Sequence, residues 1–475
     1  MKKYNLLKAI GIVFLFVIVL TWFIPIGSYS NGAFTLGDTA PVGIFDLSRI
    51  PLITIANLLQ YGLIFTLIGG LYGVLNKTGV YSNLVEKIVS KLKGKEKIFL
   101  IFTICLMTIL SSVIGLQYAL FVIVPFLIAI LRSLGFGKIT SFASTIGAIL
   151  VGNIGATYST DISYYINNYL SLGVNNEILT KIIFLIIITF LFIMFILKGT
   201  KIKINSKKNK KNENNMESIP LYEVNSKKKS TIPLIVIFIV CFILLIVNMI
   251  NWEGIFNITW FSEVYNQITS IKIGDYPIVS NILGTITSFG SWTGYDMCIF
   301  LIIMTIIIGW LYSLKFEEFM DGFINGVKEM LVPAFYAVIA NIVFATLYRF
   351  QSSANIYYTI VNFLMTTFSS LKTIMVGLSS FIGGIFYNDT SSLAVTLATP
   401  ITTFVTDTTM YSLYGMMIQV LHGIVMMIIP TSILLVAGLS YMKISYKEWF
   451  KYIWKYLLEV LVIGIIIFII VAMFI

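Results

Sequence analysis

Clusters of small and polar residues interrupt four apolar stretches of this chain, near residues 111–117, 152–161, 387–392 and 422–432. They supply hydroxyl, amide, carboxylate and imidazole groups where the neighbouring side chains are hydrocarbon. The N-terminus of a half-helix favours an anion, whereas its C-terminus and unwound carbonyls favour a cation. Because an interrupted helix in a membrane persists only where its freed backbone groups line a cavity or bind something, the interruptions predict a binding site.

The side chains in these interruptions form two expected groups. A small carboxylate or amino acid would be bound by Asn153, Thr157, Asn388, Asp389, Thr390, His422, Thr431 and Ser432. A coupling cation, Na⁺ or H⁺, would be bound by Ser111, Ser112, Gly152, Gly155, Asp389 and Ser391. For any single hydroxyl or glycine, helix packing is the alternative explanation. Gln117 and Asn341 are weaker candidates, and Arg349 is expected to extend to the membrane interface.

Three ionisable residues carry most of this chemistry. Asp389 lies between two apolar arms, where a carboxylate is costly and usually functional. It could bind a cation, carry a proton, pair with a substrate amino group or cap the following half-helix. His422, the only histidine, could bind a carboxylate, shuttle protons or be a neutral histidine hydrogen-bonded between helices. Asp161 could belong to the first interruption or lie at the outer interface.

The elements that hold these residues are predicted from the composition. Hydrophobic residues make up 58% of the 475 residues and charged residues only 11%, against about 25% charged residues in a soluble domain. We therefore predict an all-α polytopic membrane protein. Full spans are expected at 8–26, 55–76, 139–165, 178–198, 232–251, 294–314, 330–349, 411–438 and 449–475. The longer stretches 98–131 and 372–406 have polar centres, which predicts a re-entrant helical hairpin in each.

The positions of the basic residues predict the orientation. In this scheme 27 of the 32 Lys and Arg residues lie on one side of the membrane, which the positive-inside rule identifies as the cytoplasm. The N-terminus is then cytoplasmic and the C-terminus extracellular, in a bacterial cell membrane. The polar segment 199–231 is predicted to be a disordered cytoplasmic linker, and the net charge needs no nucleic acid partner to explain it.

Matching features recur at an offset close to 274 residues. Residues 1–198 form the first unit and 294–475 the second, with 232–293 as a connecting span and extracellular segment. Because the span 232–251 carries the chain outside, the second unit has the opposite orientation. Paired interruptions in inverted halves are typical of a secondary transporter. The alternative is two unrelated bundles with accidental polar breaks.

Several segments resemble the YfcC family of the ion transporter superfamily. They are 23–29 (FIPIGSY), 41–46 (PVGIFD), 68–79 (IGGLYGVLNKTG) and 429–432 (IPTS). The resemblance implies an elevator-type carrier, in which two hairpin tips and two broken helices form a mobile transport domain on a scaffold that often dimerises. It also implies dicarboxylates, other small carboxylates or basic amino acids as substrates. Sodium-coupled relatives carry Ser-Asn-Thr at each tip, a motif that this chain lacks.

The sequence favours a secondary active transporter over an enzyme, because it contains no nucleophile–base set, metal-ligand cluster or phosphate loop. We expect no cofactor other than a coupling ion. The absence of Lys and Arg near the interruptions favours a monocarboxylate or an amino acid over a dicarboxylate. A basic amino acid exchanger without ion coupling and a membrane sensor that does not transport are the alternatives to a Na⁺- or H⁺-coupled carrier.

Overall fold

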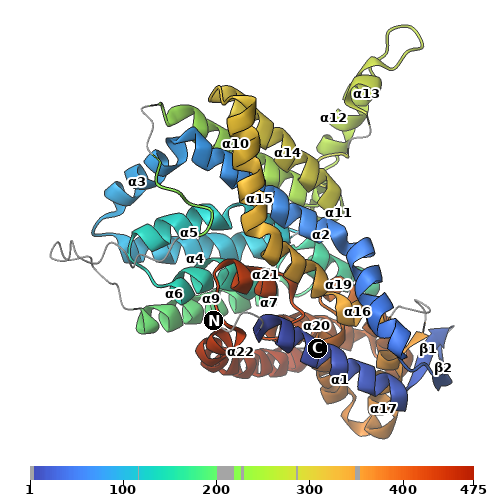
Figure 1. Cartoon of the computed structure of the whole chain (residues 1–475). Helices are drawn as coiled ribbons and strands as arrows, with labels where there is room; N and C mark the ends of the chain where they lie inside the picture. The colour runs from blue at the N-terminus through green and yellow to red at the C-terminus, as the bar shows by residue number, and fades with distance from the viewer. Residues whose placement is uncertain are drawn as a thin grey trace.

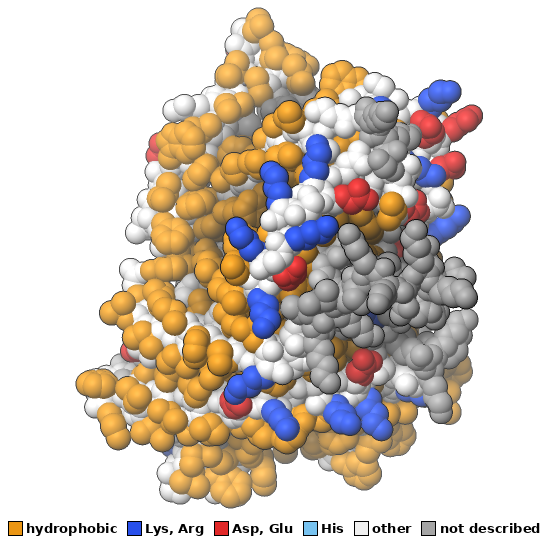
Figure 2. All heavy atoms as spheres, turned by 90° about the vertical axis from the view of Figure 1, so that its left-hand side faces the viewer, with side chains coloured by type: hydrophobic (Ala, Val, Ile, Leu, Met, Phe, Trp, Pro, Cys, Tyr) orange, Lys and Arg blue, Asp and Glu red, His pale blue; other side chains and the backbone are white. Residues whose placement is uncertain are grey.

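Helices account for most of the computed structural model, which describes residues 5–30, 32–115, 117–200, 219–225, 229–284, 287–347 and 354–474. Among these residues, nine helices are long and apolar enough to cross a membrane. Hydrophobic side chains cover much of the surface, as expected of a protein whose solvent is lipid (Figure 2). The predicted polytopic membrane protein is therefore supported, whereas the inversion of its halves stays a prediction.

The first half has nine described helices. They are α1 (Asn5–Phe23), α2 (Ile44–Thr78), α3 (Val80–Leu92), α4 (Glu96–Val113), α5 (Val124–Ser133), α6 (Lys138–Phe142), α7 (Ala148–Ile154), α8 (Tyr165–Tyr169) and α9 (Ile178–Gly199). A 3₁₀ turn, η1 (Gln117–Val122), precedes α5, and two π turns, η2 (Ala143–Gly147) and η3 (Thr160–Tyr164), precede α7 and α8. Gly79 ends α2 at a positive φ of 67°, a conformation that favours glycine.

The rest of the described chain has thirteen helices. They are α10 (Ile232–Met249), α11 (Trp252–Phe256), α12 (Trp260–Thr269), α13 (Ile278–Leu283), α14 (Gly294–Leu311), α15 (Phe316–Ile339), α16 (Ile342–Leu347), α17 (Ile356–Thr367), α18 (Lys372–Phe386), α19 (Thr390–Phe404), α20 (Tyr411–Met426), α21 (Ile433–Tyr441) and α22 (Tyr446–Phe474). Short 3₁₀ turns lie at Ser369–Leu371 and Thr408–Met410. Helix α3 and the strands β1 (Pro25–Ser30) and β2 (Ala33–Thr39) lie at opposite ends of the molecule (Figure 1).

Helices α2 and α15 cross at a contact made by glycines. A Cβ atom on Gly73 would lie 2.0 Å from the Gly322 carbonyl oxygen, and one on Gly326 would lie 1.9 Å from the Gly69 carbonyl oxygen. The backbones can approach this closely only without side chains, as in the small-xxx-small contacts of membrane helices. This crossing joins the two halves of the chain.

The expectation of an all-α chain is wrong in one region. Strands β1 (Pro25–Ser30), β2 (Ala33–Thr39) and β3 (Ala354–Asn355) form an antiparallel sheet in the order β2-β1-β3. Gly27 lies where a Cβ atom would be 2.4 Å from the Phe34 ring. The sheet was missed because its strands are short and lie outside the apolar stretches, where hydropathy gives no signal.

Two further boundaries differ from prediction. Helix α15 begins at Phe316, well before the expected start at 330, because Glu318 accepts a hydrogen bond from the Lys315 backbone N–H at 3.3 Å and caps a polar first turn. The chain also breaks between α15 and α16, at Ala340–Asn341. Arg349 lies outside the described residues.

The expected disorder of the 199–231 linker is wrong for residues 219–225, which we call the strap. The Leu221 N–H donates to Glu329 Oε1 at 3.0 Å, and Asn76 Nδ2 donates to the Leu221 carbonyl at 3.3 Å. The Tyr441 hydroxyl donates to the Pro220 carbonyl at 3.0 Å. These contacts hold the strap across α2, α15 and α21. Residues 201–218 and 226–228 lie outside the described part of the chain.

Charged side chains gather on the face that includes α3. Figure 2 shows Lys and Arg side chains concentrated there, bordered by hydrophobic surface. Lys87, Lys91, Lys93 and Lys95 in and after α3 are all exposed. This distribution agrees with a membrane protein whose charges lie at one end of its spans, but the orientation of the termini stays a prediction.

Candidate functional site

The two interruptions of the first half bind each other. Helix α4 ends at Val113 and α7 ends at Ile154, so both leave backbone groups without partners in their own helix. The Thr157 and Tyr158 N–H groups donate to the Ser112 carbonyl at 2.9 and 3.2 Å. The Ser159 hydroxyl donates to the Ile114 carbonyl at 3.0 Å. Much of the hydrogen bonding lost at each break is therefore recovered from the other.

Side chains reinforce this first junction. The Ser111 hydroxyl contacts the Asn153 side-chain oxygen and also lies 2.8 Å from the Ile149 carbonyl. Asn153 Nδ2 donates to Gln117 Oε1 at 2.6 Å, and the Thr157 hydroxyl lies 3.4 Å from that of Ser112. The structure thus brings together the predicted Ser111, Ser112, Asn153 and Thr157 with the weaker candidate Gln117.

The two glycines of this junction are explained by close packing. A Cβ atom on Gly152 would lie 2.4 Å from the Thr108 carbonyl oxygen of α4. One on Gly155 would lie 2.7 Å from a methyl group of Leu185 on α9. Neither position tolerates a larger residue without a shift, and neither observation requires a cation.

The second half is interrupted at Tyr387–Asp389, between α18 and α19. Asp389 caps α19: its Oδ1 atom accepts hydrogen bonds from the Ser392 N–H and the Ser391 hydroxyl, both at 2.7 Å. Asp389 and Ser391 are only partly buried, so this cap leaves the carboxylate accessible. The predicted capping role is confirmed.

His422 fastens this interruption to α20. Its Nε2 atom lies 3.0 Å from the Tyr387 carbonyl, which can only accept, so Nε2 carries the hydrogen. Its Nδ1 atom lies 2.9 Å from the Thr390 hydroxyl and, in a neutral ring, accepts from it. This assignment follows from the hydrogen-bond partners. His422 is fully buried, and its two bonds span the break between α18 and α19.

Asn388 connects the same interruption to a third break. Its Nδ2 atom donates to Asn341 Oδ1, and Asn341 occupies the gap between α15 and α16. Asn341 is 3% exposed. The sequence placed Asn341 among the weaker candidates, inside an expected continuous span at 330–349.

Gln419, which the sequence analysis missed, joins the two halves at the first break. Its Nε2 atom donates to the Ile154 and Ala156 carbonyls at 3.1 and 2.9 Å. Its Oε1 atom accepts from the Ser163 hydroxyl at 3.2 Å. The available signal was an amide in an otherwise apolar helix, one turn before His422 and on the same face.

Asp161 and Asp389, from opposite halves, lie close enough to interact electrostatically. Asp161 belongs to η3, and η3 contacts α19, the helix that begins directly after Asp389. Both carboxyl groups also interact with Tyr61 and Tyr118, whose rings meet edge to face at 5.0 Å between centroids. The two tyrosines were not predicted. Asp161 therefore lies on an element that packs against the second interruption, and its role stays a prediction.

Thr431 and Ser432 lie in the second broken helix, between α20 and α21. Both are buried, and the Thr431 hydroxyl has no hydrogen-bond partner among the described residues. The Trp449 indole N–H donates to the Met427 carbonyl of this break at 2.8 Å, and the Tyr446 hydroxyl donates to the Ile428 carbonyl. No hydrogen bond in the described part of the chain joins Thr431 to the Asp389–His422 group.

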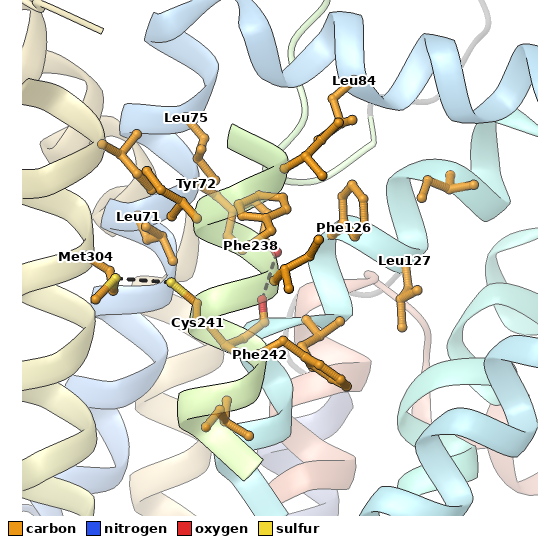
Figure 3. Close-up of a pocket in the computed structure, with 18 of the residues that line it drawn as sticks. Leu71, Tyr72, Leu75, Leu84, Phe126, Leu127, Phe238, Cys241, Phe242 and Met304 are labelled. Atoms are coloured by element: carbon orange, nitrogen blue, oxygen red, sulfur yellow. Dashed lines mark hydrogen bonds between the residues drawn. The ribbon is translucent and has the colours of Figure 1, made fainter. Parts of the chain in front are cut away.

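A cavity of about 390 Å³ lies elsewhere, between α2, α4, α5, α10 and α14 (Figure 3). We call it the apolar cavity. The Tyr72 hydroxyl donates to the Val122 carbonyl, and Cys241 contacts Met304. A carboxylate placed there would lose its hydration without gaining donors, so this cavity does not suit a charged metabolite. Within the described residues, no group of three or more His, Cys, Asp or Glu could hold a metal.

The chain is similar along nearly its whole length to a family of known proteins. A model of the family described as DcuC, C4-dicarboxylate anaerobic carrier, matches residues 5–473. No curated protein matches the chain. Among solved structures, the YdaH transporter of Alcanivorax borkumensis, described as having an unusual topology, is 12% identical over 98% of each chain, with a TM-score of 0.37.

Proposed function

The chain belongs to the C4-dicarboxylate anaerobic carrier family, and from this premise we propose that it is a secondary active transporter of a small carboxylate. The proposed substrate class is a C4-dicarboxylate, and the proposed coupling ion is Na⁺ or H⁺. The more specific YfcC membership implied by the resemblance is part of this proposal. The transport would take place by alternating access.

The observation that carries the proposal is the junction of four chain breaks, after α4, α7, α15 and α18, inside one set of apolar helices. Breaks at the ends of α4 and α7 bind each other, and the break after α18 is bound to α20 through His422 and Thr390. Gln419 then joins the two sets. Irregular backbone at membrane depth is tolerated where it is buried in protein or lines a polar cavity, which is the arrangement of a midplane binding site in carriers.

The charges of this junction support coupling to a cation. Asp161 and Asp389 interact with each other, and a C4-dicarboxylate would bring two further negative charges. Negative charges gathered in a low-dielectric setting repel strongly unless cations or protons accompany them. We therefore propose that Asp389, with Asp161, binds the coupling cation, and that Asn388, Thr390 and backbone N–H groups near them contact the substrate.

An elevator-like motion is the proposed mechanism of access. The helices flanking the breaks would move together, because hydrogen bonds at Asn153, His422 and Gln419 tie them into one body. The glycine crossing of α2 and α15 would form the stationary part. A homodimer through that part is proposed from the resemblance alone.

A second candidate substrate is an amino acid, in exchange for another. The pair Asp161 and Asp389 favours it, because two carboxylates attract the ammonium group of a substrate as well as they attract Na⁺. A substrate that carries its own positive charge would need no coupling ion. The two candidates therefore differ in what drives uptake.

Radiolabelled uptake into proteoliposomes distinguishes these possibilities. A C4-dicarboxylate, a monocarboxylate and a basic amino acid would each be tested with a Na⁺ gradient, a H⁺ gradient, or unlabelled substrate inside. Gradient-driven uptake of the dicarboxylate is the expected result. Uptake of only the amino acid, and only into preloaded vesicles, would establish exchange. Verified, correctly inserted protein that moves no test substrate would contradict the proposal and favour a sensor.

Asp389→Asn is the matched variant for this assay. Asparagine caps a helix as well as aspartate does, so the fold around Ser392 should persist while the charge is lost. We expect ion-driven uptake to fall at least tenfold, with an unchanged unfolding midpoint. Wild-type ion dependence in Asp389→Asn would remove Asp389 from the coupling role.

A further inference from the structure

The apolar cavity has a feature that the transport proposal does not use: one end of it is bordered by lysines. Its wall includes Leu84 and Ile88 of α3 and Ile235 of α10. Figure 3 shows Leu84 and Leu75 at one end of the cavity and Phe242 at the other. Lys87 lies between the two α3 residues in sequence, and its Nζ atom donates to the Thr231 hydroxyl, just before α10, at 2.9 Å.

A second lysine reaches the same end. Lys229, two residues before Thr231, donates from Nζ to the Tyr312 carbonyl at 2.6 Å. Tyr312 directly follows α14, whose Ile308 lines the cavity. The first turn of α10 and the last turn of α14 therefore bring Lys87 and Lys229 to one end of the cavity. Both lysines are exposed.

The cavity also opens toward the surface that faces lipid. Phe102 of α4 and Ile239 of α10 line it and are 55% and 54% exposed. Both belong to helices long and apolar enough to cross a membrane. The rim is therefore exposed to hydrocarbon, and the interior presents polar groups that are already paired, such as the Tyr72 hydroxyl.

From these observations we propose that the apolar cavity binds one anionic phospholipid, with an acyl chain between α4, α5, α10 and α14 and its phosphate at Lys87 and Lys229. Hydrocarbon fits walls that offer no unpaired donors, and water does not. An ammonium group has three N–H donors, so each lysine can bind a phosphate oxygen and keep its present bond. Basic pockets at the ends of membrane helices are typical sites for anionic headgroups.

The position of this site gives the lipid a structural consequence. One wall is made by α4, η1 and α5, which lead to the first chain break, and the other by α10 and α14. A bound lipid would stabilise the arrangement of these two walls, because ligand binding to the folded state alone raises its stability. The site is separate from the Asp389 junction and does not depend on the proposed substrate.

Thermal unfolding of the purified full chain in detergent tests this proposal. We expect added phosphatidylglycerol to raise the unfolding temperature by several degrees more than phosphatidylcholine does. Native mass spectrometry should find one phosphatidylglycerol retained per chain. Equal effects of the two lipids on the unfolding temperature, or no retained phosphatidylglycerol, would overturn the proposal.

Matched variants locate the headgroup and the chain. Lys87→Gln with Lys229→Gln should remove most of the difference between the lipids, whereas Lys93→Gln with Lys95→Gln removes the same charge beside α3 and should keep it. Cys241→Phe, which adds volume inside the cavity, should reduce lipid retention without removing a charge. If the variant with Lys87→Gln and Lys229→Gln responded to the lipids like the variant with Lys93→Gln and Lys95→Gln, the site would be contradicted. A folded Cys241→Phe protein that retained as much phosphatidylglycerol as the wild type would contradict it too.

Discussion

Gln419 offers the sharpest test of how the two halves are joined. Its side chain is 2% exposed and makes three hydrogen bonds, two of them to carbonyls of the first break. Leucine has a similar size and cannot form any of them. Gln419→Leu therefore leaves the Ile154 and Ala156 carbonyls without this donor while preserving the packing of α20.

The size of the effect follows from those two bonds. Hydrogen bonds between membrane helices average about 0.6 kcal/mol each, which sets a lower value of about 1 kcal/mol for the pair. A buried group left without a partner costs about 1–3 kcal/mol, and only the Ile154 carbonyl is left so, because the Ala156 carbonyl keeps the Ser163 hydroxyl as a donor at 3.0 Å. One orphaned carbonyl and one lost hydrogen bond set an upper value of about 4 kcal/mol. We expect a destabilisation of about 1–3 kcal/mol, because only the Ile154 carbonyl would lose its side-chain donor.

The assay is an SDS titration of the protein in mixed micelles, followed by tryptophan fluorescence, with uptake measured in parallel. Gln419→Leu should unfold at a clearly lower SDS fraction and lose most transport. Gln267→Leu, at an exposed position on α12, should behave like the wild type. If the Gln419→Leu midpoint equalled that of Gln267→Leu, the three hydrogen bonds would contribute nothing, and the reasoning about satisfied chain breaks would be refuted.

Three other perturbations follow from named contacts. Gly326→Ala should prevent the α2–α15 crossing and abolish folding, because its Cβ would lie 1.9 Å from a carbonyl oxygen. Gly137→Ala, where a Cβ would have nothing within 4 Å, should fold like the wild type. Size-exclusion chromatography of the two variants measures the difference. His422→Phe and Thr390→Val should each lower the SDS midpoint. The double variant should lose less stability than the sum of the two single losses, because both substitutions remove the same hydrogen bond. Strictly additive losses would show that this hydrogen bond is absent. Asn76→Ala removes the acceptor of the Glu223 N–H and should release the strap, so that a glutamate-specific protease cleaves faster after Glu223, as mapped by mass spectrometry. Asn168→Ala, at an exposed position of α8, should leave the cleavage rate unchanged.

Hydropathy predicted most element positions because membrane spans need long apolar runs, and such runs are visible in one dimension. The expected spans 178–198 and 449–475 match α9 and α22 within a few residues. Four of the chain breaks were also predictable, because polar clusters and Pro430 cannot continue an apolar helix without cost, whereas the break at Ala340–Asn341 was not. The sheet and the early start of α15 were not predicted from hydropathy, although Asn31-Gly32 between β1 and β2 is a strong hairpin signal in the sequence.

The candidate site was predictable by residue type and only partly by arrangement. Asp389 stood out because a carboxylate amid hydrocarbon is costly, and its capping role follows from the serines after it. Gln419, Tyr61 and Tyr118 did not stand out, because each is a single polar residue of a type that packs readily in helices. Their importance depends on partners more than 30 residues away.

A polytopic membrane protein with breaks at four places follows from the amino-acid sequence alone. That much follows locally, because burying an apolar run in lipid and interrupting it with polar groups are properties of short segments. Three features appear only in the folded chain: which breaks meet, the packing of η3 against α19, and the path of the strap across α2 and α15. These pairings are fixed by close helix packing at Gly73, Gly152 and Gly326, and which helix a glycine faces cannot be read from its own sequence neighbours.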